Sequence, residues 1–148
     1  MSRARREAGY SLLELLIVTV VLAVIVSIAL ASIWNALDRA KQRATMADMR
    51  SIARAIEVYN SENGYLPLAP GGLPDLRKLL VPYQSSIVPT RDHWGHDLSY
   101  RVDRAAGVYS IESFGKDGVD GADITLSTKL RFDADIVLSN GQFVAAPE

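Results

Sequence analysis

The feature that most constrains this chain is an apolar run close to its start. Residues Leu15 to Ile33 form a stretch of 19 residues that is interrupted only by Thr19, Ser27 and Ser32. As a helix, this stretch spans roughly 28 Å, close to the ~30 Å hydrocarbon core of a bilayer. The three hydroxyls can bond back to carbonyl groups of the preceding turn, so they permit insertion. The alternative is a buried core helix, but a core helix in so small a domain is seldom apolar on every face.

A short basic segment precedes this run. It reads MSRARREAG, with three arginines and one glutamate. Positive charge before an apolar segment keeps that end on the cytoplasmic side of a membrane. Two processing patterns fit the sequence. A secretory signal peptide would be cut at small residues such as Ala29 and Ala31, whereas a cut between Gly9 and Tyr10 would leave the apolar helix on the mature protein.

One carboxylate, that of Glu14, lies where the apolar run begins. An ionised carboxylate inside a bilayer costs at least about 2.5–3.5 kcal/mol on insertion scales, and it is rarely left unpaired. The simplest interpretation is that Glu14 lies at the level of the lipid headgroups, near the membrane surface.

The pattern after the apolar run predicts that the same helix continues as an amphipathic one. No glycine or proline occurs from Tyr10 to Asn63, so a single helix of about 50 residues is expected. Gly64 follows at the position where glycine commonly ends a helix. The apolar stripe that needs cover consists of Leu37, Ala40, Ala44, Ala47, Met49, Ile52, Ile56 and Tyr59.

The rest of the chain predicts a small α+β domain. A short helix is expected over Leu73 to Val81, because Pro74 suits a first turn and leucines 76, 79 and 80 share one side. Two antiparallel hairpins are expected from alternating segments, with Ser139-Asn140-Gly141 as the turn of the second. A sheet of three or four strands covers one stripe of one helix. The predicted strands are 97–102, 108–113, 136–138 and 142–144.

The segment between the two hairpins is acidic. From Glu112 to Asp135 there are six acids and three bases. Two Asp–Gly pairs, at 117–118 and 120–121, are turn formers, and this is the simplest interpretation. The functional interpretation is calcium, which takes six to eight oxygen ligands from carboxylates and loop carbonyls. The spacing does not match an EF-hand loop.

The N-terminal stretch AGYSLLELLIVTVVLAVIV resembles the prepilin cleavage and methylation motif, which is found in type IV pilins and in the pseudopilins of type II secretion. The resemblance implies that a prepilin peptidase cuts after Gly9 and that the new amino group, on Tyr10, is N-methylated. It also implies that Glu14 pairs with the Tyr10 amine of a neighbouring subunit during filament assembly.

Further blocks resemble the major, G-type pseudopilins: YN-x-x-NGYLP, then GL-x-x-L, then D-x-WG-x-x-L-x-Y. This resemblance implies a pilin-like fold with a leader at 1–9, a membrane and filament-core helix at 10–34 and a periplasmic domain at 35–148. We expect Trp94 to be a packing anchor against the long helix, with Gly95 in the turn that follows. His93 and His96 are expected to be surface loop residues, since no third metal ligand accompanies them.

The G-type pseudopilins also carry the patterns S-x-G-x-DG and D-x-DI, and they bind calcium there. On this sequence the patterns correspond to Asp117, Asp133 and Asp135, together with backbone oxygens near Ser113 and Gly115. A second candidate for the D-x-DI position is Asp123-Ile124, so more than one choice of ligating aspartates is open.

The expected function is a structural subunit of a type II secretion pseudopilus, not an enzyme. Such a subunit forms a homopolymer, and its partners are minor pseudopilins, the prepilin peptidase, the membrane and an inner-membrane assembly platform. A type IV pilin is the alternative, and a membrane-anchored module that never polymerises is a third. A net charge of −1 does not favour nucleic acid as a primary partner. The absence of cysteine excludes disulfides and cysteine-ligated zinc, and disfavours pilins that end in a disulfide loop.

Overall fold

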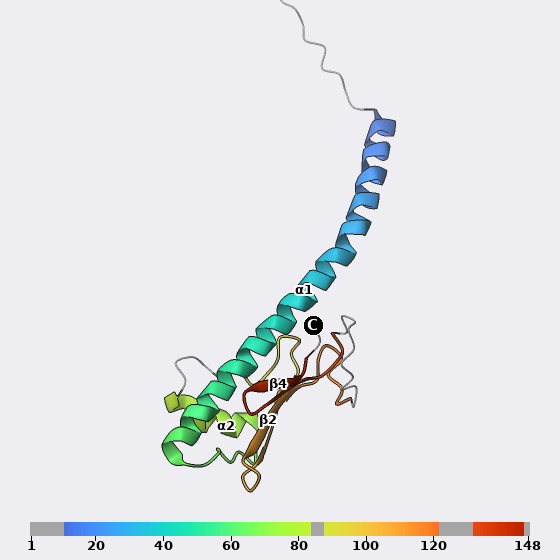
Figure 1. Cartoon of the computed structure of the whole chain (residues 1–148). Helices are drawn as coiled ribbons and strands as arrows, with labels where there is room; N and C mark the ends of the chain where they lie inside the picture. Colours follow the sequence, from blue (N-terminus) through green and yellow to red (C-terminus); the bar gives the residue numbers. More distant parts are fainter. Residues whose placement is uncertain (1–10, 84–87, 122–131, 147–148) are drawn as a thin grey trace, which may run out of the picture. The chain divides into compact units, whose positions relative to one another are not determined.

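The computed structural model describes residues 11–83, 88–121 and 132–146 (Figure 1). Contacts divide the chain into two compact units, Met1–Leu37 and Asp38–Glu148. The expected leader and Tyr10 lie outside the described residues, so the leader boundary stays a prediction. The membrane boundary at 34/35 also stays a prediction, because the helix continues through it without a break.

Helix α1 runs from Leu12 to Asn63 and contributes to both units. Its 52 residues confirm the prediction of one long helix without a glycine or proline break. Gly64 ends it with a φ of 77°, and its N–H donates to the carbonyl oxygen of Asn60 at 2.8 Å. A left-handed residue at this position satisfies a carbonyl group of the last turn, and glycine adopts that conformation without strain.

Helix α2, Leu73–Leu80, is followed by a single 3-10 turn, η1, at Val81–Tyr83. Pro74 lies in the first turn, where its missing N–H costs nothing. Leu73, Leu76 and Leu80 are buried, whereas Leu79 is only partly buried. The predicted helix is therefore confirmed, with its end one residue earlier than expected.

The four strands form one antiparallel sheet in the order β1-β2-β3-β4. Both predicted hairpins are present, and pairing of β2 with β3 joins them into a continuous meander. The β3–β4 turn contains Asn140 and Gly141, both with positive φ, as the sequence indicated. The strands are β1 Ser99–Asp103, β2 Val108–Ser113, β3 Ile136–Ser139 and β4 Gln142–Ala145.

Within the second unit, the later half of α1, helix α2 and the sheet share one apolar core, and Figure 1 shows the later half of α1 running alongside the sheet. The core contains apolar side chains from all three parts of the unit. Tyr100 is buried in this core, and its hydroxyl donates to the carbonyl oxygen of Pro67 at 2.9 Å. The fully buried apolar side chains include Met49, Ile52, Ile56, Leu76, Leu80, Ile111, Ile136 and Leu138.

The predicted apolar stripe of α1 is right in its second half and wrong in its first. Leu37, Ala40 and Ala47 are exposed, and Ala44 is only partly buried. The buried positions there are instead polar: Asp38, Gln42 and Thr45. Asp38 and Thr45 are buried because polar groups of the loop after α2 and of the acidic segment form hydrogen bonds with them. Buried polar groups need such partners, so these bonds, and not the spacing of apolar residues, decide which side chains are buried in this part of α1.

Candidate functional site

The first candidate site is the N-terminal half of α1, which exposes apolar side chains along its length; Leu16 is 63 % and Ile25 58 % exposed. Within the described part of the chain, α1 is the one helix long and apolar enough to cross a membrane. The hydroxyls of Thr19 and Ser27 donate to carbonyl oxygens three residues earlier, at 2.9 and 2.7 Å, which confirms that the helix satisfies them internally. This surface is predominantly apolar, so lipid or other apolar helices suit it.

Glu14 lies in the first turn of α1 and is exposed. A carboxylate in a first turn interacts favourably with the positive end of the helix dipole. The hydroxyl oxygen of Ser11 accepts a bond from the N–H of Leu13 at 3.4 Å, which caps the same turn. Gly9 and Tyr10, the predicted cleavage and methylation residues, lie outside the described residues.

A buried aspartate, Asp92, organises the turn that carries the tryptophan. Its side chain is fully buried, and Oδ1 accepts bonds from the N–H groups of Trp94, Gly95 and His96 at 3.0, 2.8 and 2.9 Å. Its Oδ2 accepts a bond from the hydroxyl of Ser113 at 2.8 Å. One carboxylate thus shapes the turn and ties it to the end of β2.

The same turn is fastened to α1 through Asp38. The indole Nε1 of Trp94 donates to Asp38 Oδ1 at 3.3 Å, and the Nζ of Lys116 lies 2.8 Å from Asp38 Oδ2. The bond from Lys116, helped by that from Trp94, holds the pKa of Asp38 below its usual value. Trp94 packs against the core, so its predicted role as an anchor is confirmed.

The two histidines beside Trp94 both have partners. His93 is exposed, as predicted, and its Nε2 donates to Asp48 Oδ2 at 3.0 Å. His96 is partly buried, and its Nδ1 donates to the carbonyl oxygen of Gly115 at 2.9 Å. This bond holds the beginning of the acidic segment against the tryptophan turn.

The second candidate site is a group of three acidic residues where the segment between β2 and β3 leaves and rejoins the sheet. One carboxylate oxygen each from Glu112, Asp120 and Asp135 lies within 4.8 Å of the others. Asp135 is 5 % exposed, and burial raises its pKa, with the carboxylates of Glu112 and Asp120 acting in the same direction. Three hard oxygen donors so close together suit a divalent cation such as calcium or magnesium, with loop carbonyls completing the shell.

Backbone contacts hold this group together. The N–H of Lys116 donates to the carbonyl oxygen of Phe132 at 2.8 Å, and the N–H of Gly121 donates to Asp135 Oδ2 at 3.2 Å. Gly115 has a φ of 63°, and a Cβ there would lie only 2.8 Å from the carbonyl oxygen of Ala134. The segments on either side of the loop therefore approach backbone to backbone, which only glycine permits.

The structure brings only one of the three predicted ligands into this group. Asp135 belongs to it, whereas Asp117 and Asp133 are exposed and lie outside it. Asp117 Oδ1 accepts a bond from the N–H of Val119 at 3.1 Å, a local turn of the kind that Asp–Gly pairs form. The alternative Asp123-Ile124 lies outside the described residues.

Glu112 and Asp120 were counted in the acidic segment but not singled out as ligands. A signal for Glu112 was available, because it alternates with Ile111 and Ser113 and therefore faces away from the core. Asp120 had no comparable signal, since a loop residue acquires its neighbours only when the loop folds.

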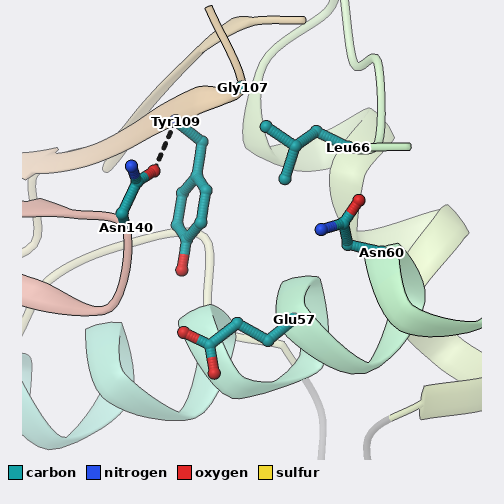
Figure 2. Close-up of a pocket in the computed structure, with 6 residues that line it drawn as sticks. All are labelled: Glu57, Asn60, Leu66, Gly107, Tyr109 and Asn140. Atoms are coloured by element: carbon teal, nitrogen blue, oxygen red, sulfur yellow. Dashed lines mark hydrogen bonds between the residues drawn. The ribbon is translucent and has the colours of Figure 1, made fainter. Parts of the chain in front are cut away.

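A small pocket of about 170 Å³ lies between α1, the β1–β2 turn and the β3–β4 turn. In Figure 2 the ring of Tyr109 points toward α1, on the side where the Glu57 carboxylate lies. The Tyr109 hydroxyl is buried and has no hydrogen-bond partner among the described residues. Burial raises its pKa, and the nearby Glu57 carboxylate adds to the effect without meeting hydrogen-bond geometry. The lining residues are Glu57, Asn60, Leu66, Gly107, Tyr109 and Asn140.

Comparisons with known proteins agree with these features. The family model for type II secretion system (T2SS), protein G, matches residues 32–127, and the model for the prokaryotic N-terminal methylation motif matches residues 4–30. Three similar relatives are each named type II secretion system core protein G. The one from Xanthomonas campestris is 31 % identical over 122 residues, covering 78 % of this chain and 82 % of the relative. The one from Vibrio cholerae is 25 % identical (84 % and 91 % covered), and the one from Klebsiella michiganensis is 27 % identical (82 % and 92 % covered).

No solved structure matches the chain. The family model nevertheless spans the end of the apolar helix, the tryptophan turn, the first hairpin and much of the acidic segment, and the methylation motif spans the basic start and the apolar run. The observed long helix on a four-stranded antiparallel sheet is the α+β, pilin-like fold that the resemblance implied. The chain belongs to the type II secretion system protein G family.

Proposed function

We propose that this chain is the major structural subunit of a type II secretion pseudopilus. Many copies stack through the N-terminal half of α1 into a periplasmic filament whose growth drives folded proteins through the outer membrane. The observation that carries the proposal is a single helix that leaves apolar side chains exposed over its first half and joins a compact folded unit. Membership of the protein G family supports the same role.

The physical basis for assembly is the need to cover that half helix. Before assembly, the hydrocarbon of the inner membrane covers it, with the folded unit on the periplasmic side. After extraction, only the same helix of other copies offers an equally apolar surface. Minor pseudopilins and an inner-membrane assembly platform are the partners that start and drive this step.

Glu14 determines how far each helix is displaced along its neighbour in the filament. Cleavage by the prepilin peptidase after Gly9 creates a positive amine on Tyr10, which is then N-methylated. In the apolar filament core, the Glu14 carboxylate pairs with the Tyr10 amine of the neighbouring copy. A helix displaced along its neighbour would leave both charges unpaired in a low-dielectric environment, which is strongly unfavourable.

The acidic segment binds calcium in this proposal. Asp135 is the shared ligand, because it belongs to the observed carboxylate group and to the pattern resembling the G-type pseudopilins. The observed group adds Glu112 and Asp120, whereas the resemblance adds Asp117 and Asp133. Calcium would supply the positive charge that lets the loop carboxylates stay close together, which stabilises the segment between β2 and β3.

The assembly proposal is tested in cells that carry the secretion system and express this chain as the only major subunit. Glu14→Gln removes the charge, and Glu62→Gln is the matched control at the far end of α1, where the side chain is exposed. We expect filaments under negative stain and export of cargo for the wild type and for E62Q, and neither for E14Q. Normal filaments from E14Q would refute the role of Glu14, and mass spectrometry that finds Met1 retained would refute the proposed processing.

The calcium proposal is tested by thermal unfolding of the full-length chain in detergent micelles, with excess calcium or with a chelator. We expect calcium to raise Tm for the wild type and to leave Asp135→Asn unchanged. The double variants Glu112→Gln/Asp120→Asn and Asp117→Asn/Asp133→Asn then tell which carboxylates bind with Asp135. Equal Tm values for the wild type in both buffers would refute calcium binding.

A further inference from the structure

Arg101 lies beside the acidic group. In the register of β1 with β2, Arg101 pairs with Ser110 and Ser99 pairs with Glu112. Partners across an antiparallel pair share a face, so Arg101 and Glu112 are diagonal neighbours on the face away from the core. Val137, the β3 partner of Glu112, follows Asp135 by two residues, which brings Asp135 to the same face.

The guanidinium of Arg101 contacts two of the three carboxylates of the group. Its Nη1 lies 3.4 Å from Glu112 Oε2, and its Nη2 lies 3.7 Å from Asp120 Oδ2. Within the described ranges, no other cation is in ion-pair distance of the group. The nearest candidate along the chain, Lys116, is paired with Asp38 instead.

Without a cation the group is unfavourable, because three carboxylates of like charge lie within 4.8 Å. Arg101 offsets part of this repulsion with one positive charge placed between two carboxylates. Its side chain is 64 % exposed, so it is free to move aside into solvent.

We propose that Arg101 is a built-in counter-cation of this acidic group, holding Glu112 and Asp120 together in the metal-free chain and competing with calcium for them. The inference rests on the proposed calcium site and deepens it. A guanidinium only donates hydrogen bonds and cannot coordinate a metal, so calcium and Arg101 exclude one another at the shared carboxylate oxygens. Arg101 therefore lowers the calcium affinity and keeps Glu112 and Asp120 together when calcium is scarce.

The test uses the full-length chain in detergent micelles and calcium chloride as the probe. Calcium affinity is measured by titration calorimetry, and Tm is measured in chelator. The variants are Arg101→Gln, which removes the charge, and Arg101→Lys, which retains it. Lys78→Gln is the matched control, because Lys78 forms an exposed ion pair with Asp75 on α2 at 2.9 Å.

We expect R101Q to bind calcium roughly three- to tenfold more tightly than the wild type and to have a lower Tm in chelator. R101K and K78Q should keep the wild-type affinity within about twofold. An R101Q affinity equal to or weaker than that of the wild type would overturn the proposal while leaving calcium binding intact. If the wild type binds no calcium but R101Q does, the result supports competition between Arg101 and calcium. If neither protein binds calcium, the proposal is overturned. The filament role is tested separately and is independent of each of these results.

Discussion

Replacing Asp92 by alanine is the most informative single test of how the tryptophan turn is held. The substitution removes an acceptor of four hydrogen bonds, three from backbone N–H groups and one from the hydroxyl of Ser113. Alanine removes this acceptor at a site where the Asp92 side chain is fully buried, although the N–H of Gly95 keeps a second bond, at 3.2 Å, to the backbone carbonyl oxygen of residue 92. We expect a loss of about 3–5 kcal/mol in the free energy of unfolding, a large share of the ~5–15 kcal/mol typical of a domain.

The substitution Asp92→Asn removes the negative charge of the side chain but keeps its shape and one hydrogen-bond-accepting oxygen. Asparagine keeps one oxygen for the three N–H groups, and its amide can donate to the Ser113 hydroxyl oxygen. The loss should therefore be smaller, about 1–2 kcal/mol. A matched control is Asp103→Ala in the β1–β2 turn, where Oδ1 accepts bonds from Ala105 and Ala106 but the side chain is exposed.

The measurement is urea unfolding of the full-length chain in micelles, in a Trp34→Phe background so that Trp94 is the one tryptophan reporting. Emission from Trp94 follows the turn itself, and far-ultraviolet circular dichroism follows the whole fold. The expected order of stability is wild type, then D103A, then D92N, then D92A. If D92A were no less stable than D103A, the assignment of Asp92 as the centre of a buried network would be refuted.

Three further predictions concern the folded unit. Tyr109→Phe should leave stability unchanged or raise it slightly, because the removed hydroxyl has no partner in the part of the chain that the structure describes, whereas Tyr100→Phe should cost about 1 kcal/mol. Gly141→Ala should cost about 1–2 kcal/mol, because φ is +79° and the new Cβ would lie 2.5 Å from Glu57 Oε1. Asp38 has a lowered pKa in the folded chain, so its stabilising effect is present above the unfolded pKa of about 3.9 and is lost as pH falls through the folded pKa. The wild type should therefore be more stable than Asp38→Asn at pH 7, and the difference should shrink below about pH 4.

Each of these has a clear contrary result. A loss for Y109F equal to that for Y100F would mean that the Tyr109 hydroxyl has a partner in solution. For the β3–β4 turn, Gly64→Ala is a useful comparison, since its φ is also positive but no atom lies within 4 Å of the added Cβ; G141A should cost more. A stability difference between the wild type and D38N that stays constant from pH 7 to pH 3 would contradict the role assigned to the Asp38 carboxylate.

The sequence predicted the secondary structure well because the relevant signals are local. Absence of glycine and proline over more than 50 residues gave the length of α1, and Gly64 marked its end. Alternation of apolar and polar residues located the four strands, and Asn140-Gly141 located the second turn. Local signals did not reveal that β2 pairs with β3, since that pairing crosses the acidic segment.

The acidic group shows what local signals omit. Composition pointed to this segment, and the resemblance to the G-type pseudopilins pointed to Asp135, but neither singled out Glu112 and Asp120 beside it. The register of three strands and the backbone approach at Gly115 determine which carboxylates meet. No spacing rule along the chain contains that information, because the carboxylate oxygens come from the ends of two strands and from a loop.

What the sequence alone determined is the apolar half helix with its single carboxylate, and with it the expectation that a membrane or other copies cover this helix. Periodicity and charge suffice for that conclusion, because a helix determines its own faces from residues three and four apart. What only the tertiary structure decided is which polar side chains become internal: Asp38, Thr45 and Asp92 are buried because donors distant in sequence reach them. A buried polar group is stable only when its partners are in place, and those partners are defined by the fold.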